Sequence, residues 1–190
     1  VESLDLSYRR KPEQQLDSIV RTRPDLVILA GGTDGGASRS ILKMLEAVGL
    51  ACYLMPEEKR PMVLYAGNRK LANDVQELLG GHAGKLQISY NIRPSLETED
   101  LEPASHELAG LVMKLRQRQI KGVDELNLWS AGNLLPTAYA EGRMIRFLSK
   151  LYESNRGLLS VNLGASAATI AAGFNGDLTL GVYPQFGLGE

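Results

Sequence analysis

The sequence has little cysteine, no long hydrophobic run and almost no net charge. A single cysteine, Cys52, among 190 residues excludes an intrachain disulfide and a cysteine-rich zinc site. A net charge of -1 argues against binding to a nucleic-acid backbone, because phosphate neutralisation requires many Lys and Arg residues. We find no signal peptide and no apolar run long enough to span a bilayer. These absences are typical of a globular protein of the reducing cytoplasm, with Cys52 as a small core residue.

Residues that bind metals or act as nucleophiles are also scarce. The two histidines, His82 and His106, are far apart in the sequence, and neither belongs to an HExxH-type spacing. No acid–base pair or activated nucleophile stands out elsewhere. We therefore expect no metal site and no catalytic residue.

The most informative stretch joins an apolar run to a glycine-rich loop. Residues 26–29 (Leu-Val-Ile-Leu) predict a strand buried on both faces, as in a parallel sheet. A helix pattern follows the loop, and the N–H groups and dipole at a helix start favour an anion. The alternative is a tight turn that uses glycine for close packing, with capping side chains. The candidate binding residues of the loop are Gly31, Gly32, Thr33, Asp34, Gly35 and Gly36.

The strand-then-helix pattern repeats along the next sixty residues. Residues 62–67 and 86–90 predict two more strands, and Asn68 is a good N-cap for the helix between them. Short connections between alternating strands and helices predict a parallel sheet. Ligands bind beyond the carboxyl ends of such strands, so the glycine loop, Asn68 and Asn91 should share that edge. For Asn68, helix capping alone is a sufficient explanation.

The remaining elements indicate a change of architecture toward the C-terminus. Asn175-Gly176 between apolar runs predicts a type I′ hairpin turn. We therefore divide the chain into an α/β lobe at 1–156 and the start of a second lobe at 157–190. The other expected elements are a helix ending at Gly49, a strand or loop at 50–55, a helix after Pro103, a short strand at 126–129, a helix at 136–152, and strands at 158–163, 167–174 and 177–183.

Several motifs resemble, in order, those of the glutamate mutase L (MutL/GlmL) family, which is unrelated to mismatch-repair proteins. The matching segments are Ala30-Gly-Gly-Thr-Asp-Gly-Gly36, Tyr65-Ala-Gly-Asn68, Asn91-Ile-Arg-Pro94, Leu101-Glu-Pro-Ala104 and Pro136-Thr137. The resemblance implies a member of the actin/hexokinase/heat-shock-protein-70 superfamily, with an ATP-binding cleft between two ribonuclease-H-like halves. It also implies a reactivating, chaperone-like partner of a coenzyme-B12-dependent mutase.

The fold class that the resemblance implies is α/β, with a three-layer, parallel-rich sheet of an actin-like ATPase fragment. An antiparallel β-hairpin would begin the second lobe. The chain starts at Val1 without methionine and stops at Glu190, just after a strand-like run. We therefore expect a piece of a longer protein, with the first phosphate loop of the family upstream of Val1.

The second phosphate motif departs from the family's pattern, which reads roughly D-[IV]-G-G-A-T-T-D. This chain has Asn162-Leu-Gly-Ala-Ser-Ala-Ala-Thr169, so the neutral amide of Asn162 replaces a carboxylate that would hold Mg²⁺. Gly164 and Ser166 still offer N–H groups to a phosphate. We therefore expect an accessory protein that binds ATP with weak or no hydrolysis. The alternatives are an interaction module that binds no nucleotide and an enzyme acting on a phosphorylated metabolite.

Overall fold

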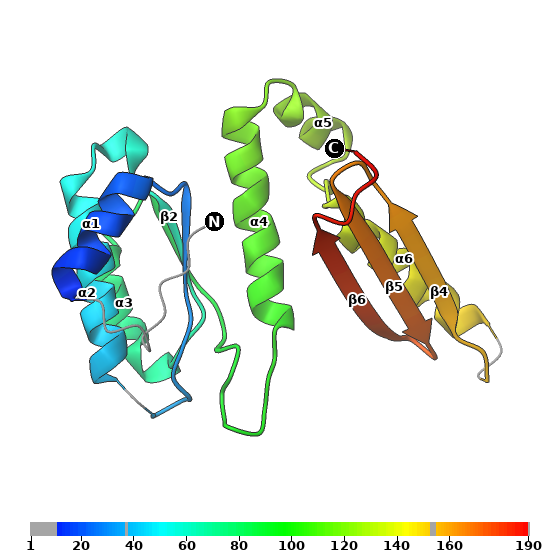
Figure 1. Ribbon diagram of the computed structural model, residues 1–190, viewed down its shortest axis with the longest axis horizontal. Helices are drawn as coiled ribbons and strands as arrows, with labels where there is room; N and C mark the ends of the chain where they lie inside the picture. Colours follow the sequence, from blue (N-terminus) through cyan, green and yellow to red (C-terminus); the bar gives the residue numbers. More distant parts are fainter. Residues whose placement is uncertain (1–10, 37, 153–154, 190) are drawn as a thin grey trace. The chain divides into compact units, whose positions relative to one another are not determined.

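The computed structural model describes residues 11–36, 38–152 and 155–189, and the chain divides into two compact units (Figure 1). Unit 1 is Val1–Lys121 and unit 2 is Gly122–Glu190. We expected a boundary after residue 156, whereas the units divide after Lys121. The reason is that helix α6 (Thr137–Leu151) packs against the strands of the second sheet. Each unit is described by itself below.

Unit 1 contains a parallel sheet with the strand order β1-β2-β3. The strands are β1 (Leu26–Leu29), β2 (Met62–Tyr65) and β3 (Lys85–Ile88), and both pairs are parallel. This confirms the predicted strand–helix–strand–helix–strand order. The carboxyl ends are level, since Leu29 pairs with Tyr65 and Tyr65 pairs with Ile88. The connections that follow the three strands therefore meet at one edge.

Helices lie on both sides of this sheet, which gives unit 1 three layers (Figure 1). On one side, Leu45 and Val75 pack with Val63 of β2 in the main core. On the other side, Leu111 packs against Met62 and Leu64. The helices of unit 1 are α1 (Pro12–Thr22), α2 (Arg39–Leu54), η1 (Glu57–Lys59), η2 (Arg69–Leu71), α3 (Ala72–Leu79) and α4 (Glu102–Gln119).

The expected burial of both strand faces holds for β2 and is wrong for β1. All four residues of β2 are buried, because it is the middle strand and has helices on both faces. In β1, Leu29 is buried, but Ile28 is 52% exposed on the edge strand. An apolar run therefore identified the strand correctly but not its place in the sheet.

Two sequence predictions about element bounds are wrong. Helix α2 does not end at Gly49 but continues to Leu54, so residues 50–55 form no strand. A Cβ at Gly49 would lie 3.0 Å from the carbonyl oxygen of Leu78, so this glycine allows close contact between α2 and α3. The expected strand at 126–129 belongs to helix α5 (Val123–Trp129), whose first turn carries Asp124 and Glu125, which favour a helix start.

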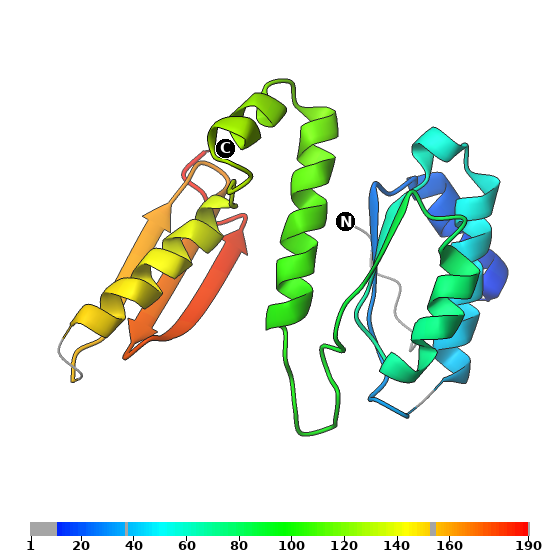
Figure 2. The ribbon, with the colours of Figure 1, turned by 180° about the vertical axis from the view of Figure 1, so that it is seen from behind.

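Unit 2 contains an antiparallel sheet with the strand order β4-β5-β6. Its strands, β4 (Leu158–Leu163), β5 (Ala167–Phe174) and β6 (Asp177–Pro184), confirm the three predicted strands. Asn175 and Gly176 have φ values of 50° and 89°, as a type I′ turn requires. Helix α6 covers one face of this sheet, as Figures 1 and 2 show from opposite sides. Among the described helices, none is long and apolar enough to cross a membrane.

Candidate functional site

The first candidate site is the carboxyl edge of the parallel sheet. The loop after β1 holds Gly31–Gly36, the connection after β2 holds Asn68, and the loop after β3 holds Asn91. Hydrogen bonds tie the three connections together. The structure therefore brings the candidate residues of unit 1 to one place, where α/β sheets commonly bind ligands.

Asn68 joins the glycine loop to the start of η2. Its side chain is only 1% exposed, and its Oδ1 accepts hydrogen bonds from the N–H groups of Lys70 and Gly35, both at 3.0 Å. The Tyr65 hydroxyl donates to the Asn68 carbonyl at 3.0 Å, and burial raises the pKa of Tyr65 to about 12, so this donor stays neutral. The capping role was predicted from the sequence, whereas the bond to Gly35 was not.

Asp34 and Asn91 form a second connection across the same edge. Asp34 Oδ1 accepts from the Arg69 N–H and from Asn91 Nδ2, each at 2.9 Å. Asn91 Nδ2 also donates to the Gly32 carbonyl at 2.9 Å. The bond from the Arg69 N–H, followed by that from Asn91, lowers the pKa of Asp34 below its usual value. Asp34 is therefore ionised at neutral pH and links all three connections.

Glycine is required in this region by backbone geometry. Gly32 and Gly35 have φ values of 71° and 79°, which L-residues with side chains rarely adopt. A Cβ at Gly67 would lie 2.7 Å from the Gly31 carbonyl oxygen, so the chain after β2 passes directly against the glycine loop. These positions explain the glycines without a ligand.

Several N–H groups of the loop already have protein acceptors. Asp34 N–H donates to the Pro94 carbonyl at 3.0 Å, and Gly36 N–H donates to the Thr33 carbonyl at 2.9 Å. The N–H of Gly35 binds Asn68, as described above. A phosphate therefore has to use other groups of this loop, or displace these bonds.

A pocket of about 340 Å³ lies beside the loop. Asp34, Asn91 and Asp100 line it, together with Arg69 and Tyr90. The guanidinium carbon of Arg69 lies 4.9 Å from the centre of the Tyr90 ring, a cation–π contact. The sequence analysis missed Arg69, Tyr90 and Asp100, although Arg69 directly follows Asn68 and Tyr90 continues the alternation of β3. The pocket carries charges of both signs.

The second candidate site lies in unit 2, at the end of β4 and in the turn to β5. Asn162 Nδ2 donates to Glu141 Oε2 of α6 at 3.2 Å, and Ser160 Oγ donates to Glu141 Oε1 at 2.5 Å. The Gly164 N–H donates to the Ala167 carbonyl at 2.9 Å, and the Ser166 carbonyl accepts from the Gln185 N–H at 3.1 Å. Contacts within unit 2 therefore hold Asn162, Gly164 and Ser166.

Glu141 is a residue of this second group that the sequence analysis missed. It is the single acidic residue between Thr137 and Leu151, and this isolated charge is the sequence feature that could have pointed to it. Because Glu141 already places a carboxylate beside position 162, the amide of Asn162 is the better neighbour there. Within the ranges that the structure describes, no three His, Cys, Asp or Glu side chains are grouped to hold a metal ion.

Comparison with known proteins identifies relatives of this chain. The model of a family described as MutL protein matches residues 3–180. Protein MutL of Clostridium tetanomorphum is 28% identical over 163 residues, which cover 83% of this chain and 33% of the relative. The chain therefore spans about a third of the length of that curated relative. No solved structure matches it significantly.

Proposed function

Because the chain belongs to the MutL protein family, we propose that it is part of an accessory protein of the glutamate mutase L type. The family match over residues 3–180 carries this proposal. In it, an actin-like ATPase fold binds nucleotide, with weak or no hydrolysis, and assists a coenzyme-B12-dependent mutase.

The nucleotide part of the proposal is supported by the position of the glycine loop. The loop lies at the carboxyl edge of a parallel sheet, beside a pocket of about 340 Å³. Arg69 supplies a cation there, and the exposed ring of Tyr90 supplies a surface for stacking. These groups are chemically suited to a phosphate and an aromatic base, respectively.

Weak hydrolysis is supported by the contacts of Asn162. Phosphoryl transfer depends on a metal ion that neutralises the developing charge, and Mg²⁺ prefers anionic oxygens as ligands. Asn162 offers an amide, and its Nδ2 is bound to Glu141. This arrangement favours binding of nucleotide over its hydrolysis.

An interaction module that binds no nucleotide is the second candidate. The observation in its favour is that the N–H groups of Asp34, Gly35 and Gly36 already have protein acceptors. The carboxylates of Asp34 and Asp100 would also repel a polyphosphate in the adjacent pocket.

Thermal unfolding with and without ATP·Mg²⁺ separates the two candidates. A nucleotide at about 100 times its dissociation constant should add about 2.7 kcal/mol of stability, which shifts the unfolding midpoint visibly. Arg69→Ala should reduce this shift, whereas Arg143→Ala, on α6, should leave it unchanged. No shift at millimolar nucleotide would refute nucleotide binding and favour the interaction module. Rapid phosphate release would refute weak hydrolysis.

A further inference from the structure

The antiparallel sheet of unit 2 has one covered and one open face. Residues that face α6 pack against it closely: a Cβ at Gly173 would lie 2.9 Å from the Ile145 carbonyl oxygen and 3.0 Å from Ser149 Cβ. The strand register places alternate residues on the opposite side. We call this opposite side the open face, and its large side chains are Leu159, Val161, Leu163, Ile170, Phe174 and Tyr183.

The open face is apolar and exposed. Residues 158–174, which make up β4, the turn and β5, include no Lys, Arg, Asp or Glu. The exposed fractions of the six large side chains range from 37% for Ile170 to 70% for Leu159. Contiguous exposed apolar surface of this kind is rare on a folded monomeric protein, and it indicates a surface that another structural element covers. In Figure 1 this face is turned toward the viewer, with α6 behind it.

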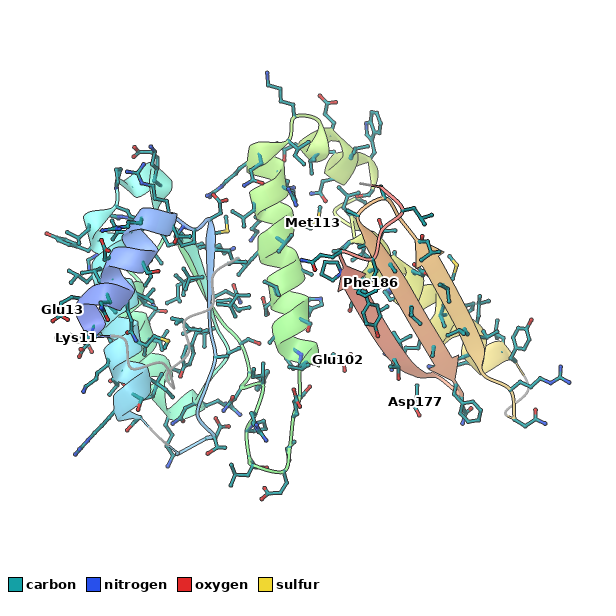
Figure 3. The ribbon with its side chains drawn as sticks, viewed as in Figure 1. Lys11, Glu13, Glu102, Met113, Asp177 and Phe186 are labelled. Atoms are coloured by element: carbon teal, nitrogen blue, oxygen red, sulfur yellow. The ribbon has the colours of Figure 1, made fainter. Side chains whose placement is uncertain are left out.

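The open face has a pocket at the end of the sheet where the Asn175-Gly176 turn joins β5 to β6. A pocket of about 390 Å³ has Leu159 and Phe174 among its walls, with Ala172 and Thr179 between them. Asp177 lies at the same end of the sheet (Figure 3). Asp177 and Thr179 also line the pocket, but its other lining residues are apolar or glycine. A depression with mostly apolar walls and a small residue at its centre is suited to a large apolar side chain from a covering element.

The dimensions of the face favour a single helix over a second copy of the chain. Three strands about 4.8 Å apart and six to eight residues long span roughly 15 by 25 Å. This footprint is below the approximately 800 Å² per partner of a standard protein interface. It matches one helix about 10 Å wide and four turns long, which is what the 15-residue α6 provides on the other face.

We propose that the open face is covered by an apolar helix from a part of the polypeptide outside these 190 residues. The Clostridium tetanomorphum relative supplies the length for such a helix, since this chain covers only 33% of it. Among the strand residues that the register places on this face, Asp177 at one end is the one charged side chain. So low a density of charge indicates a permanent intramolecular contact, which would be covered during folding. The helix presents a Leu or aromatic side chain to the pocket beside Leu159 and Phe174.

The test compares one substitution in two lengths of polypeptide. Leu159→Lys places a charge on the open face, and Leu151→Lys is the matched control on α6, with exposed fractions of 70% and 67%. In the 190-residue chain, both substitutions should leave the unfolding midpoint of unit 2 nearly unchanged. In the complete polypeptide that the gene encodes, Leu159→Lys should lower this midpoint by about 5 °C or more, because it buries a charge, and Leu151→Lys should not.

Three outcomes would overturn the proposal and identify another occupant or none. Equal effects of Leu159→Lys in the two lengths of polypeptide would show that nothing beyond the 190 residues covers the face. If Leu159→Lys strongly destabilised the monomeric 190-residue chain, unit 1 would be the element that covers the open face. A 190-residue dimer that Leu159→Lys dissociates, measured by analytical ultracentrifugation, would indicate a second copy.

Discussion

The glycine loop of unit 1 and the β4–β5 turn of unit 2 are held by different kinds of contact. In unit 1, the side chains of Asn68 and Asn91, 1% and 3% exposed, bind the loop from the two neighbouring strand ends. In unit 2, Asn162 is exposed, and main-chain bonds such as that from the Gly164 N–H hold the turn. Buried polar side chains fix the first loop, whereas main-chain bonds hold the second, which should therefore tolerate replacement of its exposed side chains.

This difference indicates how strongly each loop depends on the side chains it carries. A main-chain hydrogen bond does not depend on the side chain at its position, so substitutions at the exposed residues 162–166 should cost little stability. A buried amide cannot be replaced without leaving its partners unsatisfied. The first loop should therefore be the more sensitive of the two to mutation.

The largest expected effect comes from removing the buried amide of the first loop. Asn68→Ala leaves the N–H groups of Gly35 and Lys70 without their acceptor, which should cost about 2–4 kcal/mol of unfolding free energy. Asn162→Ala is the matched control and should cost less than about 0.5 kcal/mol, since Asn162 is exposed. Urea unfolding measures both, with hydrogen exchange assigning the transitions to the units. Equal losses of unfolding free energy in the two variants would contradict the difference between the two loops.

The covered face of the second sheet should be nearly as sensitive as the first loop. Gly173→Ala brings a methyl group to 2.9 Å from the Ile145 carbonyl oxygen, and this overpacking should cost about 1–3 kcal/mol. Gly157→Ala is the control, because the nearest atom there lies at an ordinary 3.4 Å. Thermal unfolding of unit 2 should separate the two variants; similar midpoints would mean that α6 packs less tightly than described.

A smaller effect, dependent on pH, is expected at Asp34. Hydrogen bonds from the Arg69 N–H and from Asn91 lower the pKa of Asp34 in the folded protein. The ionised carboxylate therefore stabilises unit 1 at any pH above about 4, which is the pKa of an Asp side chain in the unfolded chain. This contribution is lost as the pH falls through the folded pKa. Asp34→Asn keeps an oxygen acceptor but no charge, and should cost less than about 1 kcal/mol at pH 7. The stability gap between the two proteins should close below pH 4; a gap independent of pH would refute this role.

The smallest effect is expected from placing a carboxylate at position 162. Asn162→Asp places a second carboxylate beside Glu141, whose Oε2 lies 3.2 Å from Asn162 Nδ2. Repulsion should raise the pKa of one of the two groups, which destabilises unit 2 at neutral pH by about 0.5 kcal/mol. Stability should recover as the pH falls through the raised pKa, and Glu141→Gln should remove the effect. A variant that is stabilised at pH 7 would show that the two side chains do not interact.

Local sequence patterns predicted most elements of the fold. The apolar runs ending at Leu29 and Tyr65 form parallel strands, and Asn175-Gly176 forms the predicted turn. The errors arose where a local signal had a tertiary cause. Gly49 was interpreted as a helix end, but it is the contact point between two helices. Residues 126–129 alternate like a strand, but they end a helix with an exposed Trp129.

By itself, the sequence determined the positions of the six strands, the Asn68 cap and the presence of both glycine-rich segments, because these depend on near neighbours in the chain. The tertiary structure alone decided which groups satisfy one another. Asn68 meets Gly35 across 33 residues, Asp34 meets Asn91 across 57, and Asn162 meets Glu141 across 21. Hydrogen bonds over such separations depend on strand order and helix packing, and no local pattern encodes them.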